Sequence, residues 1–283
     1  MIRKSKSFMA LLSACMLMGS VRTEECIHTF NEHEASVFAV AVSPDGNTIA
    51  SGAGDHTIKL CDVKSGRCIQ TLKGNKKSIH SLAFNPDGMT LVSGSSDGTI
   101  KLWDIHTRKC TQTFNKHTST ICSIIFSSDG IILASGFNDG TIKLWNMHTR
   151  KCIQTLVGNG GKIDSIAFSP DGTMIVSGAG NGTITFWNRK TGECMGTLKA
   201  HDDTVYSVAL SPDGNTLATG SDGIITLWNS QTGECIGTLE GHDDIVFSIT
   251  FSPDGNTLVT GSGDGAVKSW DITFIIKPWK YID

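Results

Sequence analysis

Residues 93–104 read SGSSDGTIKLWD, and close variants of this stretch recur five more times along the chain. The other copies are SGAGDHTIKLCD at 51–62, SGFNDGTIKLWN at 135–146, SGAGNGTITFWN at 177–188, TGSDGIITLWN at 219–229 and TGSGDGAVKSWD at 260–271. In each copy an Asn/Asp/Gly-rich turn separates two short runs that are rich in β-branched and apolar residues. This pattern predicts two antiparallel strands joined by a tight turn.

A second signal repeats with the same period. Cysteines stand at 26, 68, 110, 152, 194 and 235, and each opens a short phrase such as CIQTL. An alternating apolar run and a turn of the SPDG type follow each phrase, so every unit of about 42 residues contains four expected strands, a, b, c and d. Four strands per unit at this period are typical of the blades of a β-propeller.

The number of units predicts how the ring closes. Strands a, b and c are expected at 37–62, 79–104, 121–146, 163–188, 205–229 and 246–271, and a strand d follows each of the first five sets. CIHTF at 26–30 has no blade of its own, and the sixth set has no strand d. We therefore expect an all-β, six-bladed propeller of four-stranded antiparallel blades, closed by the N-terminal strand. The expected domain spans 24–271, with a tail at 272–283.

These motifs resemble those of the WD-repeat β-propellers. The resemblance covers residues 24–271 and rests on the SPDG turns at 43, 169, 211 and 252, the DGTIKLW phrases, and closing dipeptides such as Trp103-Asp104. It implies that each complete blade has a buried tetrad, in which a histidine, a serine or threonine, and an aspartate join the strand c tryptophan. The sets that are complete by sequence are His117, Ser135, Asp139 and Trp145; His201, Thr219, Asp222 and Trp228; and His242, Thr260, Asp264 and Trp270.

The repetition of these Ser, Asp and His residues argues against catalysis, because an active site needs to occur only once whereas a structural bracket is needed in every blade. We expect no catalytic residue, no metal ligands and no cofactor. An alternative is a propeller enzyme, a hydrolase or lyase with its site at the central channel.

The first twenty residues differ in composition from the rest. MIRKSKS is basic, and the apolar run at 8–19 is too short to span a bilayer. A charged segment followed by such a run is typical of a secretory signal, and Leu12-Ser13-Ala14-Cys15 resembles a lipobox with Cys15 as the lipidated residue. This predicts export, as a periplasmic or membrane-anchored lipoprotein. The alternative is a cytoplasmic protein whose first residues are a tail or pack on the domain.

Function is expected at positions that break the repeat. On the face that bears the d–a loops, which the resemblance implies is the binding face, the inner strands of the last two blades and the first carry Tyr206, Phe247 and Phe38. The neighbouring loops carry acidic pairs, namely Asp202, Asp203, Asp243 and Asp244. The corresponding loops of blades 2–4 carry lysines instead. An acidic rim around aromatic side chains suits a protein or peptide that contains Lys or Arg, and solvated loops of ordinary variation are the alternative.

The net charge of −3 gives no reason to expect a polyanion, so no nucleic-acid partner is predicted. The sequence favours a non-catalytic, monomeric scaffold that binds a protein or peptide, with possible membrane anchoring through its N-terminus.

Overall fold

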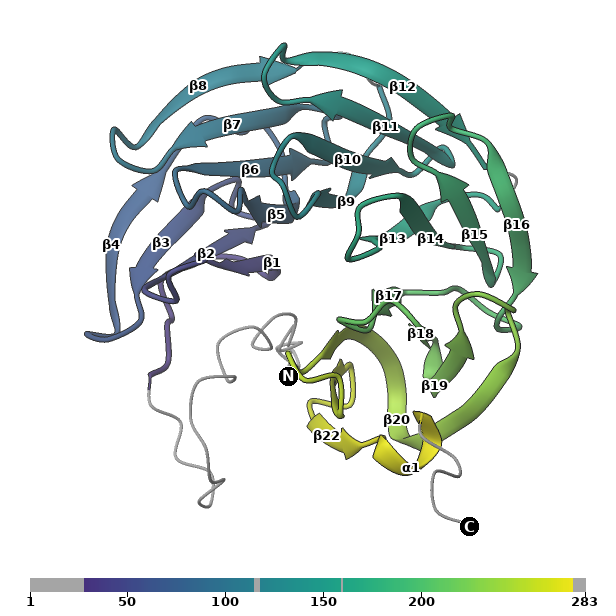
Figure 1. The fold of residues 1–283 in the computed structure, drawn as a ribbon. Coiled ribbons are helices and arrows are strands. Elements are labelled where there is room, and N and C mark those ends of the chain that lie inside the picture. Colours follow the sequence, from purple (N-terminus) through teal and green to yellow (C-terminus); the bar gives the residue numbers. More distant parts are fainter. Residues whose placement is uncertain (1–27, 115–117, 159, 277–283) are drawn as a thin grey trace.

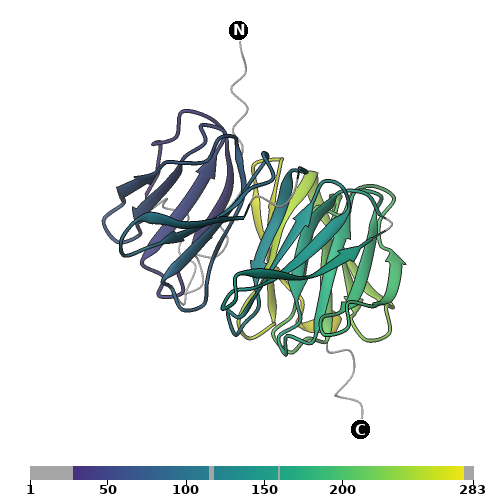
Figure 2. The same ribbon diagram turned by 90° about the horizontal axis from the view of Figure 1, so that it is seen from above.

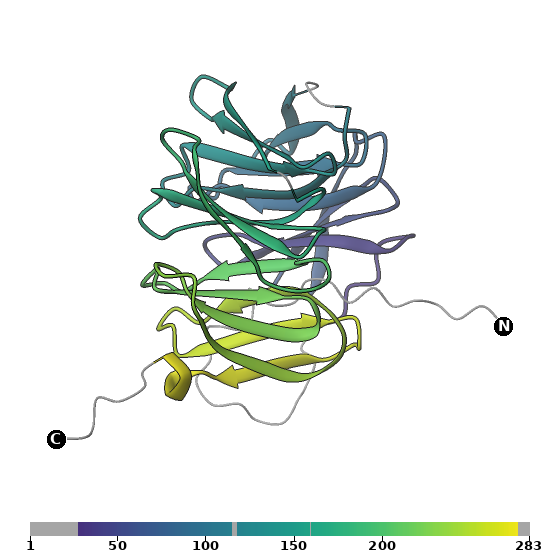
Figure 3. The same ribbon diagram turned by 90° about the vertical axis from the view of Figure 1, so that its right-hand side faces the viewer.

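The fold is a ring of antiparallel β-sheets (Figure 1). The structure is a computed structural model, and it describes residues 28–114, 118–158 and 160–276. Within each sheet the strands follow one another in chain order, and in the four-stranded sheets they run from the centre of the ring to its rim. Figures 2 and 3 show the same sheets from two other sides. The chain is therefore an all-β propeller.

Four of the sheets have four strands each. The first contains β1 (Val37–Val42), β2 (Thr48–Ala53), β3 (Ile58–Asp62) and β4 (Arg67–Leu72), and the second β5 (Ile79–Phe84), β6 (Thr90–Ser95), β7 (Ile100–Asp104) and β8 (Lys109–Phe114). The third contains β9 (Ile121–Phe126), β10 (Ile132–Phe137), β11 (Thr141–Asn146) and β12 (Lys151–Val157), and the fourth β13 (Ile163–Phe168), β14 (Met174–Ala179), β15 (Thr183–Asn188) and β16 (Cys194–Lys199).

The fifth sheet has six strands and departs from the expected six separate blades. It contains β17 (Ser207–Leu210), β18 (Thr216–Gly220), β19 (Asp222–Asn229), β20 (Cys235–Phe251), β21 (Thr257–Ser262) and β22 (Val267–Asp271). The strand β20 runs without a break through the loop expected at 240–245, and it pairs with β19 in its first part and with β21 in its last part. It thereby joins the strand sets expected for blades 5 and 6.

The turns form where the sequence predicts them, because their side chains satisfy the local backbone. In the turn between β1 and β2 the Ser43 hydroxyl donates to Asp45 Oδ1 at 2.5 Å, and the same carboxylate accepts the Asn47 amide at 3.1 Å. Gly46 adopts a φ of 73°, a conformation that glycine reaches without steric cost. The Ser-x-Asp-Gly pattern thus encodes a closed turn.

The hydrophobic core lies between neighbouring sheets. One cluster joins Val92, Ile100 and Phe114 of the second sheet to Ile121 and Trp145 of the third. The glycine after the strand b serine permits this close packing, because a Cβ on Gly94 would lie 2.5 Å from the side chain of Ile121. The Ser-Gly dipeptide of the repeat therefore has a packing role.

The expected closure by the N-terminal strand is not what the described residues show. Residues 28–36 form no strand, and His28 lies at the first sheet, with Nε2 3.3 Å from the carbonyl oxygen of Lys64. Within the described part of the chain β22 pairs only with β21. In Figure 1 no strand of the described residues lies between the first sheet and β22.

The open edge leaves β22 more exposed than its counterparts. Val267 is 51% exposed, whereas the equivalent Ile100 and Ile142 are 1% and 0% exposed. The chain continues into one turn of helix, α1 (Thr273–Ile276), whose Ile275 packs against Gly237 of β20. In the described residues no helix is both long and apolar enough to cross a membrane.

Candidate functional site

The tryptophan of strand c donates a hydrogen bond to the hydroxyl of strand b in five strand sets. The Nε1 to Oγ distance is 2.9 Å in every case, and the donor and acceptor pairs are Trp103 and Ser93, Trp145 and Ser135, Trp187 and Ser177, Trp228 and Thr219, and Trp270 and Thr260. A buried indole N–H needs such an acceptor. These pairs lie inside the sheets, away from the faces of the ring.

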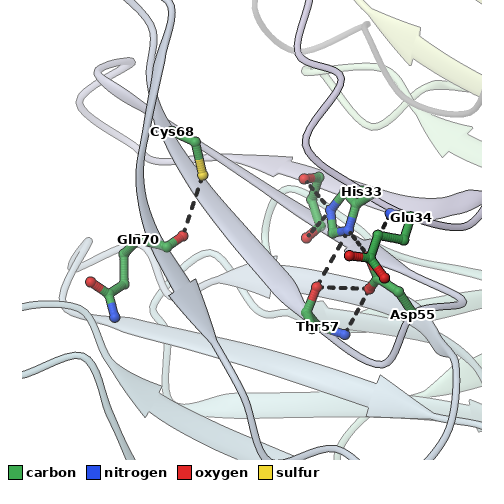
Figure 4. A network of polar contacts seen from close by, with 7 residues as sticks. His33, Glu34, Asp55, Thr57, Cys68 and Gln70 are labelled. Carbon is green, nitrogen blue, oxygen red and sulfur yellow. Dashed lines mark hydrogen bonds and ion pairs between the residues drawn. The ribbon is translucent and has the colours of Figure 1, made fainter.

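The network of the last strand set includes all four residue types. His242 lies 2.8 Å from Asp264 through Nδ1 and 2.8 Å from Thr260 through Nε2, and Thr260 accepts from Trp270. In the first sheet His33 makes the corresponding contact to Asp55 at 2.8 Å (Figure 4). Its Nε2 lies 2.8 Å from Ser51 Oγ, and Cys61 stands in the sequence where the other sets have tryptophan.

One of the other two predicted sets differs from this arrangement. His201 lies 2.7 Å from Thr219, but Asp222 begins β19 with an exposed side chain, and its backbone pairs with Ile245. The shortened turn at 221–223 moves this aspartate into a strand. Asp139 accepts a hydrogen bond from the Thr141 hydroxyl at 2.7 Å, and His117 lies outside the described residues. That these two sets form complete hydrogen-bonded tetrads that stabilise their blades stays a prediction.

The aspartates of the two histidine networks remain ionised to low pH. Burial works to raise the pKa of Asp55, but hydrogen bonds from Thr57 and His33 outweigh it and lower the pKa to about 2. Burial also opposes the effect at Asp264, where hydrogen bonds from the Ala266 amide and His242 lower the pKa to about 2. Both carboxylates therefore titrate below the ordinary value of 3.8.

This shift predicts acid sensitivity at these two positions. A depressed carboxylate pKa stabilises the fold fully above about pH 4, and the contribution is lost as the pH falls towards about 2. In chemical denaturation the variant with Asp55→Asn and Asp264→Asn should be less stable than the wild type at pH 6, and the difference should shrink between about pH 4 and pH 2. An equal difference at pH 6 and pH 2 would contradict the assignment.

Two of the predicted binding aromatics lie side by side. The Tyr206 and Phe247 ring centroids are 5.8 Å apart with an interplanar angle of 74°, and both side chains are partly exposed. The inner strands that bear them are tied together, because the Ile249 amide donates to Ser207 Oγ at 3.0 Å. Since the backbone sets their spacing, the two rings form a preorganised edge-to-face pair.

The third aromatic residue belongs to a different pair. Phe38 stacks on His80, with ring centroids 4.9 Å apart and an interplanar angle of 28°. Among the described residues no ring contact joins Phe38 to Phe247, so the continuous arc of Tyr206, Phe247 and Phe38 stays a prediction. Burial lowers the pKa of His80 and so favours the neutral ring that stacks on Phe38.

The predicted acidic residues precede Tyr206 and Phe247 by three or four positions in the sequence. Asp202, Asp203, Asp243 and Asp244 are all exposed. The carboxylates of Asp203 and Asp244 each cap the following backbone amide, at 2.6 Å and 2.7 Å. These local bonds orient the two carboxylates and leave acceptor capacity on each of them.

An ion pair that the sequence did not predict lies on the same face, among the lysine-bearing loops of blades 2–4. Lys162 forms an ion pair with Asp164, whose side chain is only 9% exposed and whose Oδ2 has no hydrogen-bond partner among the described residues. Burial raises the pKa of Asp164, and Lys162 opposes this shift. Lys162 directly precedes β13 and Asp164 lies within it. Their spacing of two residues could have indicated the pair, because side chains at this spacing in extended backbone share a face. The pair reduces the basic charge on that side.

Among the described residues no group of three His, Cys, Asp or Glu side chains could hold a metal ion. The cysteines of the described segments are free thiols. Cys15, the predicted lipidation site, lies outside these segments.

Two models of known families match the chain. A family model described as the IFT122 first beta-propeller matches residues 5–190. A model described as WD domain, G-beta repeat matches residues 192–229 and 233–271. The search of curated proteins gives no significant match.

The match overturns the predicted location. IFT122 is a cytoplasmic and ciliary transport protein, and the match begins at residue 5, inside the segment interpreted as an export signal. The prediction of an exported, periplasmic or membrane-anchored lipoprotein was therefore wrong. A short apolar run after a few basic residues is a weak signal, because the same pattern occurs within folded domains.

Proposed function

The chain belongs to the WD-repeat β-propellers, in the family of the IFT122 first propeller, and on this basis we propose that it binds a Lys- or Arg-containing protein or peptide on its d–a loop face. Propellers of this family are non-catalytic scaffolds, so the alternative of a propeller enzyme is set aside. We propose further that the scaffold acts as a single chain.

The observation that carries the proposal is the Tyr206–Phe247 pair. Two partly exposed aromatic rings on tethered inner strands offer a rigid apolar anchor, and residues of this kind dominate the binding energy of many interfaces. The rings also present the π surfaces over which a Lys or Arg cation is attracted, and arginine stacks on such faces readily.

The acidic loops support a cationic partner. Asp202, Asp203, Asp243 and Asp244 are exposed and stand three or four positions before the two aromatic residues in the sequence. Such charges speed the encounter of a basic partner and set its orientation, and their effect weakens as salt rises. Neutralising the four positions should therefore slow association more than it speeds dissociation.

The proposal predicts a large loss of binding in the variant with Tyr206→Ala and Phe247→Ala. Removing two central aromatics should weaken the complex by about 30-fold or more, because each anchor contributes about 1–2 kcal/mol or more. The partner can be captured by crosslinking pull-down from the native host, and the affinity then measured with the purified partner. Ile153→Ala, which removes a 54% exposed side chain from β12, is the matched control. Unchanged affinity in the double variant would remove this face from consideration.

We also propose that the ring has six blades and that residues 26–30 supply the fourth strand beside β22. Residues 26 and 27 lie outside the described segments, and two observations support the pairing. First, His28 lies against Gly66, as Gln154 lies against Gly192 between the third and fourth sheets. Second, the edge of β22 is exposed at Val267, where a fourth strand covers the equivalent isoleucines.

A further inference from the structure

One contact occurs at two junctions between sheets, where the outer strand of one sheet meets the turn between the third and fourth strands of the next. Gln70 accepts a hydrogen bond from the Arg108 guanidinium at 3.3 Å, and Gln112 accepts one from Arg150 at 2.9 Å. At the following junction the amide of Gln154 fills the space beside Gly192. These side chains close the junctions on the outer side of the ring.

The junction between the fourth and fifth sheets has glycine at both positions. Gly196 stands on β16 where β4, β8 and β12 have glutamine, and Gly233 stands in the turn where Arg108 and Arg150 occur. A Cβ added to either glycine would meet no atom within 4 Å. The next junction is filled again, because Ile275 of α1 packs over Gly237.

The missing side chains leave a groove of about 760 Å³ between these two sheets. Its apolar wall includes Met174, Phe186 and Met195, and Met195 is 55% exposed. Figure 3 shows this side of the molecule, with β16 and the β19–β20 hairpin turned towards the viewer. A groove of this volume accommodates a long side chain with a short stretch of backbone.

The charged residues that line the groove are both acidic. They are Asp171 and Asp213, and the lining contains no Lys or Arg. Hydrogen bonds from Ser169 and Ser211 hold the pKa of Asp171 and Asp213 below the ordinary range, so both stay ionised at neutral pH. Each carboxylate can accept a further hydrogen bond.

We propose that this groove binds an arginine side chain from a partner protein. The apolar stem of the arginine would lie on Phe186 and Met195, and its guanidinium would pair with Asp171 and Asp213. Within the chain itself, Arg108 and Arg150 occupy the corresponding place at two other junctions. The partner therefore supplies the cation that the repeat lacks here. This surface is separate from the Tyr206–Phe247 pair and does not depend on the function proposed for that pair.

The NMR signals of methionine methyl groups allow a direct test on the full chain. Met174 and Met195 line the groove, and the 71% exposed Met89 lies outside it as an internal control. The probe is a capped nonapeptide of alanine and serine with one central arginine. The control peptide (the twin) has the uncharged citrulline in place of the arginine. The arginine peptide should shift the Met174 and Met195 signals in a saturable way, and the twin should bind about tenfold or more weakly. Absence of these shifts, or equal shifts with both peptides, would overturn the proposal.

A variant whose own side chains fill the groove provides a second test of the proposal. The variant with Gly196→Gln and Gly233→Arg rebuilds the pair seen at Gln112 and Arg150, and position 233 has a φ of 73°, close to the 56° of Arg150. This variant should no longer respond to the peptide, whereas the variant with Tyr206→Ala and Phe247→Ala should respond like the wild type. If the double glycine variant does not fold, Gly196→Gln alone serves the same purpose. A response that persists in the filled groove would overturn the proposal.

Two other occupants would also overturn it. Deletion of residues 277–283, which include Lys277 and Lys280, should leave the Met195 signal of the free protein unchanged. A change would assign the groove to this chain's own C-terminal segment. A Met195 signal that depends on protein concentration would assign it to a second copy.

Discussion

Replacing Trp145 by alanine should lower the free energy of unfolding by about 3–5 kcal/mol, the range for truncation of a buried large aromatic side chain. Trp145 is 2% exposed, and its ring stacks on Phe114 of the preceding sheet at a centroid distance of 4.8 Å. Its Nε1 donates to Ser135, whose hydroxyl would lose this donor. The substitution therefore removes a bond within the third sheet and contacts with the second. Urea denaturation followed by circular dichroism would measure the loss.

Trp187→Ala is the matched comparison. Trp187 is 3% exposed and donates to Ser177 at the same 2.9 Å, so burial and the first hydrogen bond are alike. Leu156 takes the place that Phe114 has beside Trp145, and Asn159 stands in the sequence where His117 stands for that set. Without an aromatic stack the loss should be about 1 kcal/mol smaller. Equal losses in the two variants would contradict a stabilising effect of the Phe114–Trp145 stack. They would also contradict the expectation that the set with His117 stabilises its sheet more than the set with Asn159.

Truncating Phe30 to alanine should cost about 3 kcal/mol if residues 26–30 complete the last blade. The equivalent residues of the paired outer strands are almost fully buried, with Leu72 at 2% and Phe114 at 5% exposure. Seated beside Val267 in the same register, Phe30 would be buried to a similar extent. Thr29→Ala, at the exposed neighbouring position, controls for changes in the segment itself.

Hydrogen exchange of β22 gives an independent measurement of the same closure. Its backbone amides should be protected to the same degree as those of β7, whose outer edge is paired with β8. Phe30→Ala should reduce this protection, and Thr29→Ala should not. A loss of stability below about 1 kcal/mol together with rapid exchange in β22 would contradict closure by this segment.

The fold within each sheet could be predicted from the sequence because every signal for it is local. Turn residues such as Ser43, Asp45 and Gly46 bond to their own neighbours, and strand alternation decides which side chains enter the core. The continuity of β20 and the position of residues 28–36 depend on contacts between distant segments, and no local pattern specifies them. For the same reason the sequence predicted the neighbouring rings of Tyr206 and Phe247 but not the stack of Phe38 on His80.

The groove beside Gly196 was open to prediction but required a different comparison. Aligning the repeats shows glutamine at 70, 112 and 154, and glycine at 196 and 237. The alignment does not show which residue faces this position from the next sheet. The contact between Gln112 and Arg150 supplies that information, because it crosses from one sheet to the next.

The placement of the core between sheets has a consequence for how the chain unfolds. Phe114 and Trp145 belong to different sheets but to one cluster, and the Ser207 hydroxyl binds a backbone amide in the next repeat. No sheet in the middle of the ring can lose its strands without exposing the apolar faces of both neighbours. Neighbouring repeats should therefore melt together as one cooperative unit, and a fragment cut at a repeat boundary should lose more stability than one blade contributes by itself.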